Sequence, residues 1–253
     1  AGDAGLRVQE DALRMIRYCR FLPRFAAMGI EPQAENVLRE YGSLCAGLSG
    51  ERVANEMRRI MVGGRLKDVI GLMQDSKIDQ AALGLSLDPS RLANDDDIGS
   101  MIAGLGENVD FAWLVNLAVA MPSGSAAVLA KRLRLSRAEE RCLTRLDRGL
   151  GEDDMTMLSG ARWRQAVYYL GDMAALLFAV QSWRNGHALD ASRLAEFKVW
   201  TPPKNPICGA DLLSHGVDNG PGLGQMVKDA ERRWVTSNFT LGKAALLEWL
   251  FGN

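Results

Sequence analysis

Hydrophobic residues recur every three or four positions along nearly the whole chain, which is the spacing of helices that bury one face. Strict alternation of apolar and polar residues is scarce, and no Asn-Gly or Asp-Gly turn joins two β-branched runs. The pattern therefore predicts an all-α fold.

Proline, glycine and capping residues predict where the helices begin and end. A first helix is expected over 9–28 with a kink at Pro23, because proline removes a backbone donor. Pro32 suits the first turn of a second helix ending near Gly47, and Ser49 caps a third through Met61. Further helices are predicted over 66–76, 98–105, 111–121, 123–133, 136–150, 160–185, 190–200, 209–215, 222–237 and 241–251.

One segment, 201–206, contains three prolines and breaks helix and sheet alike. It is the best candidate for a linker. The helix stop at Gly63-Gly64 and this segment divide the chain into three parts, which we call the neck (1–64), the body (65–200) and the tail (201–253).

Composition excludes several classes of protein. The chain has 253 residues, a net charge of -1, four scattered cysteines and two histidines, which suit neither a disulfide framework nor a zinc site. No apolar run approaches the ~18 residues that a membrane span needs, so no membrane partner is expected. A reduced, cytoplasmic location is the simplest interpretation. Since the first residue is Ala, we expect a C-terminal part of a longer protein.

The opening segment places acids and arginines together. On a continuous helix Glu10, Arg14, Arg17 and Arg20 would share one side, with Asp11 beside them. Local ion pairing explains such a pattern without any function. Alternatively, a carboxylate can accept from an exocyclic amine while a guanidinium donates to the adjacent ring nitrogen. Cytosine and adenine share that edge pattern, whereas uracil and guanine show the opposite one.

A second group of arginines lies on the helix predicted after Ser136, which with Glu139 forms a capping box. Four arginines fall within about 80° of one another on that helix, opposite its leucines. RNA phosphate is the natural partner of such a row, and a solvated face neutralised by Glu139, Glu140 and Asp147 is the alternative. The predicted RNA-binding residues are Arg137, Arg141, Arg145, Arg148, Lys131, Arg132, and in the tail Lys228 and Arg232.

The run Glu10-Asp11-x-x-Arg14, preceded by Gly2-Asp3-Ala4 and followed by Arg17, resembles the neck of bacterial class II CCA-adding tRNA nucleotidyltransferases and poly(A) polymerases. Further segments resemble that family in the same order along the chain. They are Leu48-Ser49-Gly50-Glu51-Arg52-Val53, Leu133-Arg134-Leu135-Ser136, Trp200-Thr201-Pro202-Pro203-Lys204 and Phe239-Thr240.

The resemblance implies that the chain forms multi-helix neck, body and tail subdomains in an elongated array. It also implies a function for each of these parts. Asp11 and Arg14 would read the incoming CTP or ATP, supported by Glu10 and Arg17, while body and tail would grip tRNA at its 3′ end and acceptor/T-arm region. The family's Gly-Ser and Asp-x-Asp head, which holds two Mg²⁺ ions, is not found in this sequence. We expect no catalytic residue and no metal ligand in this chain, and no activity from it alone.

Two alternatives stay open. Within the family, the parent could be a poly(A), A-only or CC-only enzyme rather than a CCA-adding one. Outside it, the chain could be a non-catalytic helical scaffold that binds a protein, and weak dependence of binding on salt would distinguish that case from RNA binding.

Overall fold

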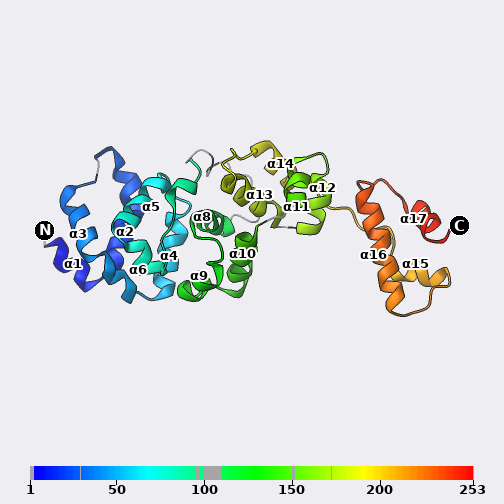
Figure 1. The fold of residues 1–253 in the computed structure, drawn as a ribbon, viewed down its shortest axis with the longest axis horizontal. Coiled ribbons are helices and arrows are strands. Elements are labelled where there is room, and N and C mark those ends of the chain that lie inside the picture. Colours follow the sequence, from blue (N-terminus) through cyan, green and yellow to red (C-terminus); the bar gives the residue numbers. More distant parts are fainter. Residues whose placement is uncertain are drawn as a thin grey trace. The chain divides into compact units, whose positions relative to one another are not determined.

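The computed structural model describes residues 3–28, 30–94, 97, 99, 110–149, 152–171 and 173–252. Every regular element in this part of the chain is helical, which confirms the all-α prediction (Figure 1). The α-helices are α1 (Ala4–Glu10), α2 (Leu13–Phe21), α3 (Pro32–Tyr41), α4 (Gly50–Ile60), α5 (Leu66–Asp75), α6 (Ile78–Leu83), α8 (Ala112–Ala120), α9 (Ala126–Leu133), α10 (Arg137–Arg148), α11 (Glu152–Ser159), α12 (Trp163–Leu170), α13 (Met173–Arg184), α14 (Ala191–Val199), α15 (Gly209–Ser214), α16 (Pro221–Thr236) and α17 (Lys243–Phe251). The 3₁₀ helices are η1 (Leu22–Met28), η2 (Gly42–Gly47) and η3 (Pro89–Arg91).

The chain divides into two compact units that are not continuous in sequence. Unit 1 comprises Ala1–Gly151 and Asp172–Lys198, and unit 2 comprises Glu152–Gly171 and Val199–Asn253. The division into neck, body and tail stays a prediction beside this one. Within the described stretches, no helix is long and apolar enough to cross a membrane.

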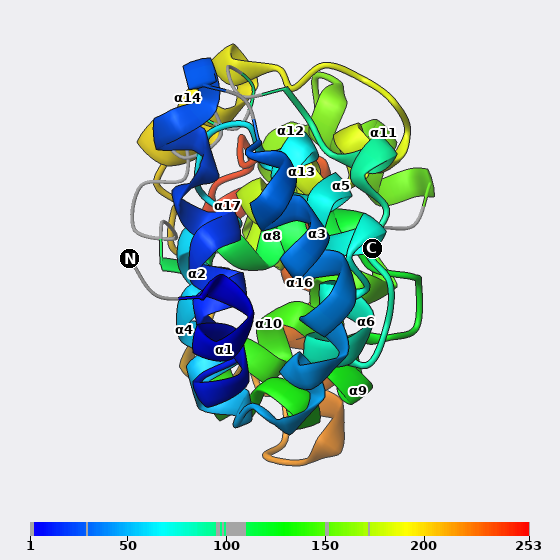
Figure 2. The ribbon, with the colours of Figure 1, turned by 90° about the vertical axis from the view of Figure 1, so that its left-hand side faces the viewer.

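The core of unit 1 surrounds α8, whose nine residues are all buried. A helix that is apolar on every side needs partners all around it, and α4, α10 and α13 each pack against α8. At the N-terminal side of the unit, α1 lies next to both α2 and α3, as Figure 2 shows. This arrangement sets the start of α2 between α1 and α4.

Unit 2 has its own smaller core, built on α16. Trp234 of α16 is buried with Leu212 of α15 and Leu246 of α17. Tyr168 of α12 packs edge-on to Trp234, with ring centroids 5.8 Å apart, and donates a hydrogen bond of 2.6 Å to Glu231. The segment that contains α12 is therefore part of the same core as the last three helices.

Several helices were predicted nearly to the residue. Ser49 is the N-cap residue of α4, although its side chain makes no capping bond. In α10 the expected capping box is present, since the Ser136 hydroxyl accepts from the Glu139 N–H and Glu139 accepts from the Ser136 N–H. Helices α6 and α11 were not predicted, and the helix predicted over 98–105 falls almost wholly outside the described residues.

Two predicted helices were wrong in the same way, because each is two helices with a break. The expected helix over 9–28 is interrupted at Asp11, whose backbone is extended, and becomes 3₁₀ from Leu22, next to Pro23. The expected helix over 160–185 is divided at Gly171, whose φ of 56° lies in the left-handed region that glycine adopts readily. The halves on either side of Gly171 belong to different units.

Candidate nucleic-acid interface

The break at Asp11 is held by the Asp11 side chain itself. Helix α1 is capped by Asp3, whose Oδ1 accepts from the N–H of Gly5 at 2.7 Å, and it ends at Glu10. Asp11 Oδ1 then accepts from the N–H of Leu13 at 3.2 Å, where α2 begins. Aspartate is among the favoured residues for satisfying free N–H groups at a helix start. The carboxylate is thus fixed in the turn between two helices.

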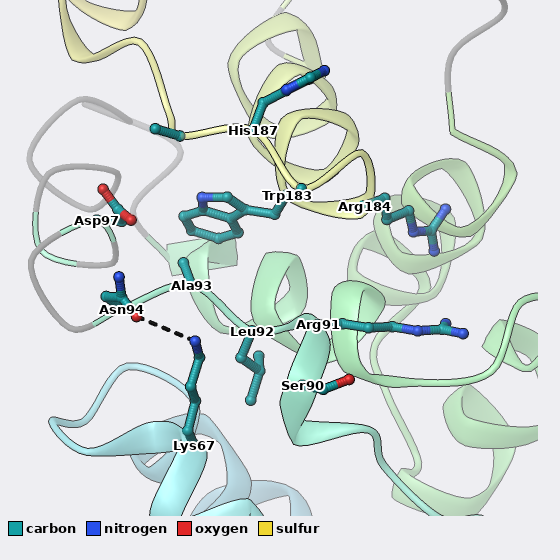
Figure 3. Close-up of a pocket in the computed structure, with 12 residues that line it drawn as sticks. Lys67, Ser90, Arg91, Leu92, Ala93, Asn94, Asp97, Trp183, Arg184 and His187 are labelled. Atoms are coloured by element: carbon teal, nitrogen blue, oxygen red, sulfur yellow. Dashed lines mark hydrogen bonds between the residues drawn. The ribbon is translucent and has the colours of Figure 1, made fainter.

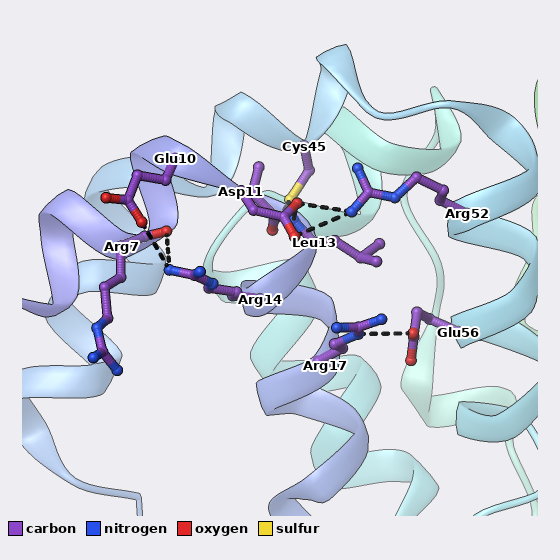
Figure 4. A network of polar contacts seen from close by, with 10 residues as sticks. Arg7, Glu10, Asp11, Leu13, Arg14, Arg17, Cys45, Arg52 and Glu56 are labelled. Atoms are coloured by element: carbon purple, nitrogen blue, oxygen red, sulfur yellow. Dashed lines mark hydrogen bonds and ion pairs between the residues drawn. The ribbon is translucent and has the colours of Figure 1, made fainter.

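A second partner of Asp11 comes from α4. Arg52 Nη2 donates to Oδ1 and Oδ2 of Asp11 at 3.0 and 3.1 Å (Figure 4). Burial alone would raise the pKa of Asp11, but the Leu13 N–H and the Arg52 guanidinium together hold it below its usual value. Asp11 is therefore ionised at neutral pH, and 29% of its side chain remains exposed.

Arg14 lies in the first turn of α2, on the side of Asp11 that faces α1 (Figure 4). Its Nη1 donates to the carbonyl of Arg7 at 2.9 Å and to Glu10 Oε2 at 3.2 Å. A guanidinium has five N–H donors, and 45% of the Arg14 side chain is exposed. Donors therefore remain for a ligand, and the predicted pair of Asp11 and Arg14 is open to solvent rather than sealed in the core.

Arg17 is tied to a residue whose role was not predicted from the sequence. Glu56 of α4 has only 5% of its side chain exposed, and it accepts from Arg17 Nε at 3.1 Å and from Arg20 Nη1 at 2.7 Å. Arg17 itself is 51% exposed, so its remaining donors reach solvent beside Arg14. The signal in the sequence was a glutamate in the buried stripe of α4, next to Met57.

The arginine face of α10 comprises Arg137, Arg141, Arg145 and Arg148, and its role in RNA binding stays a prediction. Leu143 and Leu146 are buried on the opposite side, Arg145 is partly exposed and the other three arginines are exposed. Within the described part of the chain, none of the four makes an ion pair or a side-chain hydrogen bond. The face is therefore positive and unpartnered.

Two of the three acids that could neutralise this face are used elsewhere. Glu139 accepts from Arg58 Nη2 at 2.7 Å, and its side chain is 14% exposed. Asp147 accepts from the N–H groups of Gly124 and Ala126 at 3.0 and 3.1 Å and lies 3.6 Å from Arg184. Only Glu140 remains exposed among the three. The alternative of a self-neutralised surface is correspondingly weakened.

The flanking cations differ in what they contact. Lys131 is exposed, whereas Arg132 Nη2 donates to the carbonyl of Leu48 at 3.1 Å and so connects α9 to the start of α4. The backbones meet closely there, since a Cβ at Gly50 would lie 2.1 Å from the Arg132 carbonyl oxygen. Arg132 therefore has a structural contact that the sequence did not predict.

In unit 2, both predicted cations lie on the surface of α16. Lys228 is exposed, and Arg232 is 73% exposed, with its Nη1 3.7 Å from Asp229 of the preceding turn. A cavity of about 420 Å³ is lined by Arg232 together with Asp229, Arg233, Thr236 and Trp249.

Another cavity of about 420 Å³ opens in unit 1 near the C-terminal end of α13 (Figure 3). Its wall includes Trp183 and His187 on one side, and Lys67, which donates to Asn94 at 3.1 Å, on the other. None of the predicted site residues lines it. Over the described residues, no group of three or more His, Cys, Asp or Glu side chains could hold a metal ion.

The sequence of this chain is similar to those of known proteins. A family model described as "Probable RNA and SrmB- binding site of polymerase A" matches residues 27–83. The mitochondrial CCA tRNA nucleotidyltransferase 1 of Danio rerio is 27% identical over 98% of this chain and 57% of its own length. The CC-adding tRNA nucleotidyltransferase of Shouchella clausii is 26% identical over 98% of this chain and 64% of its own length.

The fold also resembles a solved structure. The Bacillus stearothermophilus CCA-adding enzyme in complex with CTP matches with a TM-score of 0.61 and 18% identity, over 98% of this chain and 63% of that one. The chain thus spans less than two thirds of the length of each of these relatives, and the likeness extends over nearly all of its own residues.

Proposed function

We propose that this chain, which is similar over 98% of its length to CCA tRNA nucleotidyltransferases and matches a polymerase A RNA-binding family model over residues 27–83, is the nucleotide-selecting and RNA-binding portion of an enzyme that adds C and A to tRNA 3′ ends. The observation that carries the proposal is the ionised, partly exposed Asp11 fixed between two helices, with the partly exposed Arg14 beside it. ATP and CTP are then the substrates, and tRNA is the partner.

Selection by this pair follows from hydrogen-bond chemistry. An ionised carboxylate only accepts and a guanidinium only donates, so together they complement a base edge with an amine beside an unprotonated ring nitrogen. Cytosine and adenine have that edge. Arg52 and Leu13 keep the carboxylate charged and oriented, Glu10 orients Arg14, and Arg17 extends the donor surface. The base is thereby read without a nucleic-acid template.

The arginine face of α10 supplies the grip on RNA in this proposal. Arginine contacts to phosphate position a nucleic acid without reading its sequence. Lys131 extends the face at α9, while Lys228 and Arg232 provide a second contact in unit 2. Contacts to the acceptor/T-arm region of tRNA would direct its 3′ end toward Asp11.

The proposal assigns no catalytic residue and no Mg²⁺ ligand to these 253 residues. Transfer of a nucleotide then needs carboxylates from outside these 253 residues, and the chain alone is expected to be inactive with tRNA, Mg²⁺, ATP and CTP. A cytoplasmic location is part of the proposal for a bacterial-type enzyme, whereas the vertebrate relatives are mitochondrial by name.

Nucleotide selection is tested by NMR titration of the chain with CTP, ATP, UTP and GTP. CTP and ATP are expected to shift the Arg14 and Arg17 side-chain Nε signals, and UTP and GTP are not. Asp11→Asn should remove the preference, because an amide can donate as well as accept. Glu35→Gln, which breaks an exposed ion pair with Arg39 on α3, serves as the control. Equal shifts by all four nucleotides would contradict the proposal.

RNA binding is tested by measuring the affinity for a tRNA transcript over a range of salt concentrations. Each phosphate that an arginine neutralises contributes about 0.7–0.9 to the slope of log K against log salt. Reversing the charge at Arg141 and Arg145 should weaken binding and lower the slope by about 1.5. Unchanged affinity in that double variant would refute the arginine face, and no tRNA binding by the unmodified chain would favour a protein-binding scaffold.

A further inference from the structure

The tail has an exposed tryptophan that no predicted role uses. Trp249 of α17 is 46% exposed, whereas Trp113, Trp163, Trp183 and Trp234 are each at most 5% exposed. A large aromatic ring left on the surface loses the stabilisation that burial would give it. Trp249 is therefore a candidate for contact with a ligand.

The surroundings of Trp249 are cationic. The guanidinium of Arg233 lies over its ring, 5.8 Å from the centroid. Arg232, 73% exposed, lines the same cavity of about 420 Å³, a volume within the range of small-ligand sites. The one acid in the wall, Asp229, accepts from Gln225 at 3.0 Å and pairs with Arg232, so its charge is already compensated.

We propose that Trp249, Arg232 and Arg233 form a site for one unpaired nucleobase of RNA and its adjacent phosphate. The proposal rests on the proposed function, since it assumes that RNA is the partner, and it adds a residue and a type of contact which that function does not include. An aromatic ring beside exposed guanidinium groups is the arrangement that binds single-stranded nucleic acid, because each base can stack while arginine holds the phosphate. Lys228, one turn before Arg232, extends the path for the backbone.

The site differs from the arginine face in what it recognises. The face of α10 offers charge alone, and it suits the phosphates of paired or unpaired RNA. The Trp249 site requires a base that can leave its stack, as bases in loops and at ends of RNA do. The affinity for paired RNA should consequently not depend on Trp249, whereas the affinity for RNA with unpaired bases should.

The experiment compares the complete chain with Trp249→Ala and Trp249→Phe in binding three RNAs: a tRNA transcript, an unpaired oligonucleotide of about ten nucleotides and a fully paired duplex. Trp249→Ala should weaken binding of the unpaired oligonucleotide about tenfold, within the range that base stacking on an aromatic ring supplies. Trp249→Phe should retain most of the affinity, and duplex binding should not change. RNA carrying 5-iodouridine should crosslink to Trp249 on irradiation.

Phe251→Ala is the matched control, because Phe251 is an exposed aromatic of the same helix that stacks on His215 and does not line the cavity. Its effect should stay below twofold. Unchanged affinity of Trp249→Ala for unpaired RNA, or an equal loss on the duplex, would overturn the inference. If tRNA still binds and loses affinity on charge reversal at Arg141 and Arg145, the proposed function stands and only this inference fails.

Discussion

Substitution of Glu56 gives a direct test of how the nucleotide-selecting region is supported. The carboxylate of Glu56 is the common acceptor of Arg17 and Arg20, and it is 5% exposed. Glu56→Gln keeps the size of the side chain and one acceptor oxygen but removes the charge. Arg20, 16% exposed, is then left facing a neutral group, whereas Arg17 can be hydrated where it is exposed.

The expected loss of stability follows from this difference in exposure. Removing one partner of a buried ion pair costs about 3–5 kcal/mol. Since only Arg20 stays largely buried and glutamine still accepts one bond, we expect the free energy of unfolding to fall by about 2–3 kcal/mol. The melting temperature should drop by roughly 4–12 °C, because each kcal/mol corresponds to about 2–4 °C in a chain of this size.

The assay is urea unfolding followed by circular dichroism, with Glu51→Gln as the control. Glu51 lies on the same helix and pairs with Arg134, but both side chains are more than half exposed, at 53% and 67%. An exposed pair contributes about 0–1 kcal/mol, so the control should be nearly neutral. A double-mutant cycle with Arg20→Gln should show coupling. If Glu56→Gln costs no more than Glu51→Gln, or if the two changes at Glu56 and Arg20 add, the reasoning is refuted.

Three further outcomes are expected. Arg52→Gln should raise the pKa of Asp11 toward its ordinary value, because the hydrogen bond from the Arg52 guanidinium, which favours the charged carboxylate, is lost. A ¹³C NMR titration of the Asp11 carboxyl measures this pKa, and an unchanged pKa would rule out the Arg52 contact. A thiol reagent at neutral pH should modify the exposed Cys208 in the native chain. The three buried cysteines should react only after unfolding, because burial raises the pKa of each of their thiols to about 12; they are Cys19, Cys45 and Cys142. Finally, the Lys243 hydrogen bond lowers the pKa of Asp211 to about 2. The contribution of the Asp211 carboxylate to the stability of unit 2 should therefore be complete above pH ~4 and be lost as the pH falls through 2. If Asp211→Asn and the unmodified chain unfold in acid at the same pH, this expectation is contradicted.

The parts of the fold that were predictable are those fixed by local sequence. The capping box of Ser136 and Glu139 and the leucine spacing behind it specify α10 without help from the rest of the chain. The arginine face could be predicted for the same reason. The ion pairs of Glu139 and Asp147 could not be predicted from the local sequence, because their partners come from positions far away in the chain.

Breaks inside apolar stretches were harder to predict. Helical periodicity continues through Asp11 and through Gly171, and either residue can occur within a helix at modest cost. At the break at Asp11 the carboxylate accepts from Arg52, 41 residues later, and the break at Gly171 accompanies a change from one unit to the other. Asp11 and Arg14 were predicted as a pair, but their surroundings from α4 depend on tertiary structure.

The interleaving of the two units has a consequence for anyone who wishes to excise the C-terminal part. A cut after Trp200, at the proline-rich segment, separates α12 from α16 and removes the Tyr168 ring from Trp234 and Phe239. The resulting fragment of residues 201–253 would expose that aromatic surface and should aggregate or stay unfolded. A self-sufficient module would have to splice 152–171 directly onto 199–253, so this fold resists dissection by a single truncation.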